Sequence, residues 1–163
     1  MVCFNGFDTY TTKCVEDTVQ LGRSFAESPE AKLDRNSVVL MYGEMGAGKT
    51  HFVKGMALGL GIDALVTSPT FALMNEYCCS NGSNGNDDKA PTLYHFDLYR
   101  IRSLEELNDI GFFDCVGNGV VAAEWAANID GLNREFGEYY VVGFTKNEKN
   151  DRERKICIDF VRT

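Results

Sequence analysis

No stretch of this sequence stays apolar for the roughly 18 to 20 residues that a helix needs to span a bilayer. The first eight residues also lack a basic segment followed by an apolar one, which is the pattern of a secretory signal. We therefore expect a soluble, cytoplasmic protein with no membrane partner.

Basic residues are few, because 16 lysines and arginines stand against 24 acidic residues and leave a formal net charge of −8. A protein that holds a nucleic acid by its overall charge needs the opposite balance, since its basic side chains replace the counterions of the phosphates. Any contact with a nucleic acid is therefore expected to be local or to go through a partner protein.

Patterns for a metal cluster or for disulfides are also missing. None of the six cysteines belongs to a C-x-x-C motif, and only His51 and His95 could add imidazole ligands. We expect all six cysteines to be free thiols in a reducing compartment.

The chain is long enough for one domain and short for two. With 163 residues, 44% of them hydrophobic, it can bury a substantial core, so we expect a single domain over residues 1–163. Residues 78–91 are rich in Asn, Gly, Ser and Asp and contain Asn-Gly twice. This composition predicts a loop insertion within that domain.

The most informative segment that is present is residues 43–50, hereafter the phosphate loop, which reads Gly-Glu-Met-Gly-Ala-Gly-Lys-Thr. It matches the pattern G-x-x-x-x-G-K-[ST] at every position. Residues 38–42 before it are typical of a buried strand, and apolar residues follow it at helical spacing over 51–60. A strand, a glycine-rich loop and a helix in this order predict a site for a nucleoside triphosphate.

Each residue type in the phosphate loop has a chemical reason. The glycines allow a tight curl in which successive N–H groups point at phosphate oxygens, and the helix that follows directs its positive dipole end at the same anion. Lys49 adds a positive charge, and Thr50 adds a hydroxyl for Mg²⁺. The expected nucleotide-binding residues of the loop are Gly43, Glu44, Met45, Gly46, Ala47, Gly48, Lys49 and Thr50.

The remaining pattern predicts an α/β fold. Helices are expected at 14–26 and 103–110, and Asp8, Thr9, Thr11 and Thr12 are possible caps of the first. After Gly61 we expect a short strand, a turn at 68–70 and a further strand that ends at about residue 77. The other strands are expected at 37–42, 92–98, 119–125, 139–145 and 155–161. Strands that alternate with helices and then form a late pair predict a three-layer sandwich like that of P-loop NTPases. Its sheet should be mainly parallel, with antiparallel edge strands.

Two carboxylates at expected strand ends are candidates for the metal site. Glu124 follows the continuous apolar run 120–123, which is typical of a central parallel strand, whereas Asp97 ends the alternating run 93–96. On this pattern Glu124 is the nearer metal group, with Asp97 close by. The alternative for either residue is a strand-end carboxylate that faces water or, for Asp97, an arginine such as Arg100.

Three other side chains near the expected strand ends each allow two interpretations. Thr70 could orient a water molecule or meet the γ-phosphate, or its hydroxyl could bond its own turn. Trp125, the only tryptophan, could belong to the core or cover the nucleotide. His95 is expected to pack in the sheet rather than to act in catalysis, because no nucleophile pattern accompanies it.

Five short words occur in order along the chain: the phosphate loop, Ser-Pro-Thr-Phe at 68–71, Tyr-His-Phe-Asp-Leu-Tyr-Arg at 94–100, Glu-Glu-Leu and Ile-Gly-Phe within 105–112, and Glu-Trp at 124–125. Together, over about residues 14–130, they resemble the TsaE family, also called YjeE. The resemblance implies a P-loop ATPase that uses ATP and Mg²⁺. It also implies that the protein works with the TsaB and TsaD proteins to form N6-threonylcarbamoyladenosine on tRNA, and meets the tRNA only through that complex.

The resemblance also implies roles for single residues. It puts ATP on Gly46 to Thr50 and Mg²⁺ on Thr50 and Glu124, and it makes Asp97 and Thr70 further active-site residues, with Asp97 near the metal. The expected catalytic residues are then Lys49, Asp97 and Thr70. Trp125 and, in the late turn, Arg152 resemble the family's other nucleotide contacts.

Two other functions fit a phosphate loop. A small-molecule kinase would use the same loop but would need an arginine-rich lid and an acceptor pocket, and neither is apparent in the sequence. A nucleotide-dependent binding module would instead change its affinity for a partner between ATP and ADP, with hydrolysis incidental.

Overall fold

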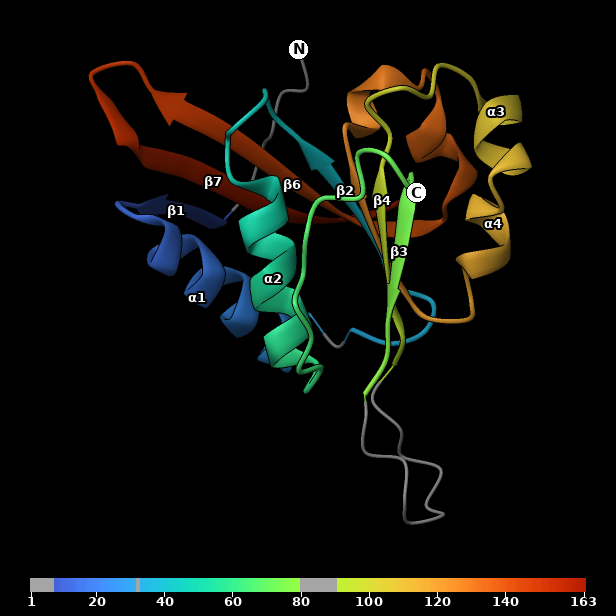
Figure 1. Ribbon diagram of the computed structural model, residues 1–163, viewed down its shortest axis with the longest axis horizontal. Helices are drawn as coiled ribbons and strands as arrows, with labels where there is room; N and C mark the ends of the chain where they lie inside the picture. Colours follow the sequence, from blue (N-terminus) through green and yellow to red (C-terminus); the bar gives the residue numbers. More distant parts are fainter. Residues whose placement is uncertain (1–7, 32, 80–90) are drawn as a thin grey trace.

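The computed structural model describes residues 8–31, 33–79 and 91–163. In the described residues one seven-stranded sheet, in the order β1-β7-β6-β2-β5-β4-β3, separates two layers of helices (Figure 1). In chain order the elements are β1 (Asp8–Thr12), α1 (Val15–Glu27), β2 (Val38–Tyr42), α2 (Lys49–Gly59), β3 (Met74–Tyr77), β4 (Leu93–Asp97), α3 (Leu104–Asp109), α4 (Phe112–Cys115), β5 (Val120–Glu124), η1 (Ala126–Asn128), η2 (Leu132–Glu135), β6 (Glu138–Asn147) and β7 (Asn150–Arg162).

The four central strands, β6, β2, β5 and β4, are parallel, and the strands beyond them, β7 and β1 on one edge and β3 on the other, are antiparallel. This confirms the expected α/β sandwich. β2 is central because it is apolar on both faces, so either side can meet a helix layer. Because these four strands are parallel, their carboxyl ends meet at one edge of the sheet, which is where parallel sheets carry their functional loops.

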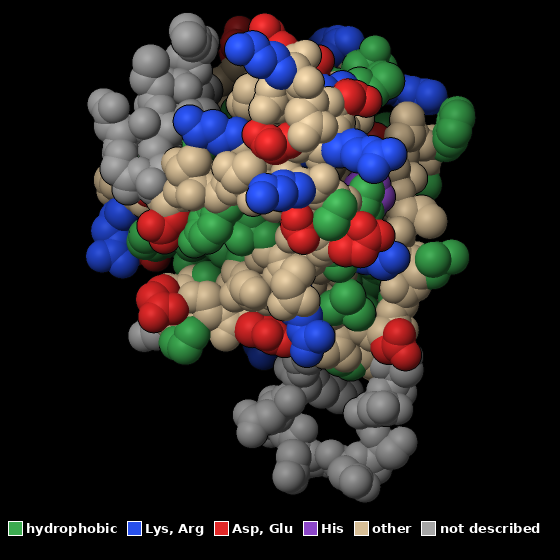
Figure 2. All heavy atoms as spheres, turned by 90° about the vertical axis from the view of Figure 1, so that its left-hand side faces the viewer, with side chains coloured by type: hydrophobic (Ala, Val, Ile, Leu, Met, Phe, Trp, Pro, Cys, Tyr) green, Lys and Arg blue, Asp and Glu red, His purple; other side chains and the backbone are tan. Residues whose placement is uncertain are grey.

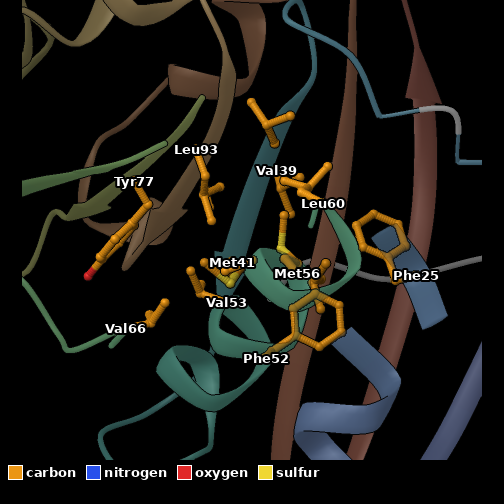
Figure 3. Close-up of a cluster of buried hydrophobic side chains, with 14 of the residues drawn as sticks. Phe25, Val39, Met41, Phe52, Val53, Met56, Leu60, Val66, Tyr77 and Leu93 are labelled. Atoms are coloured by element: carbon orange, nitrogen blue, oxygen red, sulfur yellow. The ribbon is translucent and has the colours of Figure 1, made fainter. Parts of the chain in front are cut away.

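Two hydrophobic cores lie on the two faces of the sheet. Val39 and Met41 of β2 pack into the core under α1 and α2, together with Phe25 and Phe52 (Figure 3). Leu40, the residue between them in the strand, packs into the opposite core under α3 and α4. The alternation of one strand thus connects both layers. Figure 2 looks onto the side that carries β1 and α1, where acidic and basic side chains lie interspersed at the surface.

α1 and α2 touch through their backbones because glycines stand at the crossing. A Cβ on Gly55 would lie 2.0 Å from the carbonyl oxygen of Val19, and one on Gly22 would lie 2.1 Å from that of Phe52. Only residues without a side chain permit this approach. The two glycines therefore determine the distance between α1 and α2, and α2 begins directly after the phosphate loop.

The structure corrects three local predictions. Residues Asp8–Thr12 do not cap α1 but form β1, which pairs with the long strand β7, and the N-cap residue is Cys14. The expected strand after Gly61 is absent from the described residues. There the backbone N–H of Thr67 donates to the Tyr77 hydroxyl at 3.2 Å, so a side chain replaces a strand partner. The helix predicted at 103–110 is followed, after Gly111, by the unpredicted α4.

Several sequence expectations concern residues at or beyond the described ranges. The expected insertion at 78–91 falls largely on residues 80–90, and Cys3 also falls outside the described residues. The five described cysteines are free thiols. Among the described residues no helix has the length and apolar character needed to cross a membrane.

Candidate functional site

The phosphate loop leaves the carboxyl end of β2 and turns into the first residue of α2. Gly46 and Gly48 adopt left-handed backbone angles, with φ of 72° and 106°, which side chains other than glycine rarely allow. Gly48 is the N-cap residue of α2, so the helix begins at Lys49. The loop and the N-terminal end of an 11-residue helix therefore face the same space, an arrangement suited to an anion.

Lys49 is 3% exposed and folds back over the loop that precedes it. Its Nζ donates to the carbonyl oxygens of Gly43 at 2.7 Å and Glu44 at 2.9 Å, and it lies 3.9 Å from the centre of the Trp125 ring. Burial lowers the pKa of Lys49, and the negative charge of Glu124 partly opposes that effect. Burial thus disfavours the charged form of Lys49, and an anion bound beside the ammonium group would favour that form again.

Glu124 ends β5 and meets the first turn of α2. The Thr50 hydroxyl donates to its Oε1 at 2.7 Å, and Nε2 of His95 lies 2.9 Å from the same oxygen. Glu124 is 4% exposed as a whole residue. A buried carboxylate needs such donors because an unpaired charge away from water is costly.

Asp97 ends the neighbouring strand β4, in register with Glu124. It is 3% exposed. Its Oδ2 accepts hydrogen bonds from Thr70 at 2.7 Å and from Ser68 at 3.2 Å, and its Oδ1 accepts one from the backbone N–H of Tyr99 at 3.0 Å. Asp97 thereby fastens the loop before β3 to the edge of the sheet where the phosphate loop lies.

Trp125 follows Glu124 in a left-handed backbone conformation, with φ of 62°. Such angles are uncommon for a bulky residue and mark positions that the surroundings enforce. Here the indole packs edge to face against Tyr99, with ring centres 4.9 Å apart, and covers Lys49. Trp125 thus forms part of the cavity wall and also packs against the edge of the core under α3 and α4.

These groups surround one cavity of about 420 Å³. It is lined by residues 45–51 together with Ser68, Thr70, Asp97, Tyr99, Glu124 and Trp125. Gly43 and Glu44 do not line it, but their carbonyl oxygens accept hydrogen bonds from Lys49, which does. The structure therefore brings together residues from four separate parts of the sequence.

Arg152 is the predicted site residue that does not join this group, since it is not among the residues that line the cavity. It lies on β7 two residues before Arg154, whose guanidinium donates to the carbonyl oxygen of Gly46 at 3.3 Å. The late-turn arginine that touches the phosphate loop is therefore Arg154. Alternation along the strand puts the two arginines on the same face, because they are two residues apart. Their positions along β7 therefore make the difference, and of the two it is Arg154 that bonds the loop.

Oxygen donors of the kind that Mg²⁺ prefers are present in the cavity wall as the Thr50 hydroxyl and the carboxylates of Glu124 and Asp97. No group of three His, Cys, Asp or Glu side chains suited to a metal occurs within residues 8–31, 33–79 and 91–163. This donor set fits a cation that takes most of its ligands from phosphate and water, as Mg²⁺ commonly does, and does not fit an all-protein metal cage.

Sequence reasoning missed the parts played by Ser68, Tyr99 and His95. Ser68 stands in the same Ser-Pro-Thr turn as Thr70, and its hydroxyl reaches the same oxygen of Asp97. Tyr99 could have been suspected because it follows Asp97 closely. The contact of His95 with Glu124 joins residues 29 positions apart and has no local signal.

Comparisons with known proteins agree on one family. A family model described as "Threonylcarbamoyl adenosine biosynthesis protein TsaE" matches residues 12–156. A Treponema pallidum protein named "tRNA threonylcarbamoyladenosine biosynthesis protein TsaE" is 42% identical over 118 residues, which are 72% of this chain and 80% of that protein. A Bacillus subtilis protein of the same name is 39% identical over 109 residues, 66% of this chain and 62% of that protein.

A solved structure shares the fold over nearly the whole chain. The crystal structure of Bacillus subtilis YdiB superimposes with a TM-score of 0.68 and 25% sequence identity, and the match covers 99% of this chain and 90% of that chain.

Proposed function

This chain belongs to the TsaE family of threonylcarbamoyladenosine biosynthesis proteins, and from that premise we propose that it is a Mg²⁺-dependent ATPase that assists this tRNA modification. The observation that carries the proposal is the meeting, around one cavity, of the phosphate loop, Lys49, the Thr50–Glu124 pair and Asp97. A loop of this kind binds the β and γ phosphates of a nucleotide.

Lys49 is the residue that we assign to the phosphates. Its ammonium group already lies over the loop, held by two backbone carbonyls and the Trp125 ring. In this buried setting a positive charge interacts with the γ-phosphate more strongly than in water, and most strongly where negative charge develops on the transferred group. Lys49 would therefore both bind ATP and stabilise the transition state.

Thr50 and Glu124 are the residues that we assign to Mg²⁺, with Asp97 beyond them. When bound, the cation would neutralise part of the negative charge of the phosphates. Thr50 can offer a lone pair of its hydroxyl oxygen to the cation while its O–H donates to Glu124 through the 2.7 Å hydrogen bond. Glu124 thus holds the threonine in the orientation that exposes its lone pair.

Asp97 and Thr70 are the residues that we assign to the attacking water. Asp97 keeps the Thr70 hydroxyl at the cavity wall through a 2.7 Å hydrogen bond. A hydroxyl and a carboxylate in that position can orient a water molecule toward a γ-phosphate and receive its proton. Since ordering of that loop depends on two hydroxyl contacts, we expect hydrolysis by the isolated protein to be slow.

The proposed partners are the TsaB and TsaD proteins, with tRNA reached through them in the cytoplasm. The proposal rests on the family's part in forming threonylcarbamoyladenosine and on the chain's net charge of −8, which disfavours direct binding of tRNA by bulk charge. ATP turnover would then serve to reset or advance the partners' cycle.

The test is a reconstituted reaction with purified TsaB, TsaD, tRNA and Mg²⁺. Lys49→Ala should lower ATP hydrolysis and formation of the modified base by at least about 100-fold, as the loss of a transition-state contact does. Lys54→Ala is the matched control, because Lys54 lies exposed on the same helix. Undiminished modification with Lys49→Ala would overturn the ATPase proposal, and a change in partner affinity between ATP and ADP without any need for hydrolysis would favour a binding module.

A further inference from the structure

His95 is a fully buried polar residue in the middle of β4, and none of the roles assigned above uses it. Its strand pairs with β5 on one side and β3 on the other, and His95 stands opposite Ala122 of β5. A buried imidazole is unfavourable unless its nitrogens find partners, so its presence in the sheet calls for a compensating interaction.

One ring nitrogen has such a partner. Nε2 lies 2.9 Å from Oε1 of Glu124, the oxygen that also accepts the Thr50 hydrogen bond. An ionised carboxylate only accepts hydrogen bonds, so the imidazole is the donor. Both donors fall on Oε1, and within the described ranges of the chain Oε2 accepts no hydrogen bond.

The other ring nitrogen has none. Nδ1 is buried and lacks a hydrogen-bond partner among the residues that the structure describes. A phenyl ring in this position would occupy a similar volume without leaving a polar atom unpaired, so packing alone does not account for histidine here. The hydrogen bond to Glu124 is the interaction that accounts for a histidine at position 95.

We propose that His95 is a positioning residue for the divalent-cation site. By donating to Oε1 it fixes the side chain of Glu124 against Thr50, so that Oε2 is the oxygen directed to the cavity and free to act toward a cation or its water shell. This inference rests on the proposed function. Groups that orient a metal-site carboxylate in this way typically contribute 10-fold to 100-fold to metal affinity.

The test measures Mg²⁺-dependent binding of a fluorescent ATP analogue, which does not require turnover. His95→Phe keeps the ring volume and removes the donor, and we expect it to raise the Mg²⁺ concentration for half-maximal binding at least about 10-fold. Binding of the analogue in the presence of EDTA should stay within about twofold of the wild type, because the phosphate loop is untouched. Tyr94→Phe is the matched control, since Tyr94 is the neighbouring residue of β4 and points to the opposite core.

A second pair of variants covers the case in which His95→Phe does not fold, as judged by its thermal unfolding. Both carry a polar amide. The nitrogen of His95→Gln can take the place of Nε2, whereas that of His95→Asn lies nearer the position of Nδ1 and falls short of Glu124. We expect the Gln variant to keep Mg²⁺ dependence within about threefold of the wild type and the Asn variant to lose it like Phe.

The outcomes separate the two proposals. A wild-type protein that binds no ATP analogue with Mg²⁺ would refute the proposed function. A wild type that binds, with folded Phe or Asn variants of unchanged Mg²⁺ dependence, would overturn the role of His95 alone. Equal losses in the Gln and Asn variants would also overturn it, because they would show a requirement for the ring and not for the donor.

Discussion

Gly55 lies at the crossing of α1 and α2. Replacing it with alanine has two opposite effects on the stability of the protein, and the size of each can be estimated. In the interior of a helix alanine is favoured over glycine by about 1 kcal/mol, so propensity alone predicts a more stable protein. The tertiary contact predicts the reverse. A Cβ at this position would lie 2.0 Å from the carbonyl oxygen of Val19 and 2.7 Å from the backbone nitrogen of Arg23.

The clash is with backbone atoms, so no side-chain rotation can relieve it. Ordinary contact between a carbon and an oxygen needs more than 3 Å, and α2 must therefore move away from α1 by an ångström or more. Overpacking of this kind costs about 3 kcal/mol, and the shifted helices also lose contacts between Phe25 and Phe52, whose rings lie 5.6 Å apart. Subtracting the helix propensity leaves a net loss of about 2 kcal/mol, or roughly 4 to 8 °C in Tm for a chain of this size.

The assay is urea unfolding of Gly55→Ala beside the wild type, followed by binding of a fluorescent ATP analogue. Because the phosphate loop leads into α2, the displacement should also weaken nucleotide binding. Gly137→Ala is a suitable control, as a Cβ there meets no atom within 4 Å. A Gly55→Ala protein as stable as the wild type would refute the claim that the close helix crossing is required.

The other predictions concern the site and the pH dependence of stability. Glu124→Ala should raise the Mg²⁺ concentration for half-maximal ATP hydrolysis at least about 10-fold, and more than Asp97→Ala does. The reason is that Glu124 bonds the Thr50 hydroxyl, whereas Asp97 holds the loop before β3. A Mg²⁺ titration with the reverse order would show the two roles exchanged. Arg154→Ala should weaken binding of an ATP analogue about threefold and Arg152→Ala should leave it unchanged, since only Arg154 bonds the phosphate loop; equal effects in a binding titration would contradict this. Burial raises the pKa of Tyr42 from 10.0 to about 12, so the folded state keeps a proton that the unfolded chain releases, and stability should fall as pH rises from 10 to 12. Unfolding measured across that range should show a shallower fall in Tyr42→Phe, and equal slopes would count against the shift.

Local features of the sequence predicted the phosphate loop and the elements beside it. The positive φ angles at Gly46 and Gly48 follow from the absence of a side chain, and the apolar run before them is enough to make a buried strand. The start of α3 is also fixed locally, because the Ser103 hydroxyl accepts a hydrogen bond from the backbone N–H of Glu106. These features depend on residues within a few positions of one another.

Predictions failed where a distant partner decided the outcome. Asp8–Thr12 has residues that could cap a helix, yet β7 extends far enough to offer it a free edge, and the segment becomes a strand. The residues after Gly61 are apolar enough for a strand, but the backbone N–H and carbonyl oxygen of Thr67 both bond the hydroxyl of Tyr77. Neither partner is visible from the segment itself.

The sequence by itself determined the loop, its glycines and the acidic residues at two strand ends, because each is a short pattern with a local physical cause. Only the tertiary structure decided which groups meet. Thr50 and Glu124 are 74 positions apart, and their hydrogen bond exists because β2 and β5 are adjacent parallel strands whose carboxyl ends share one edge. The same strand order places Asp97 beside Glu124 and His95 behind it, so the register of the sheet, rather than any motif, assembles the site.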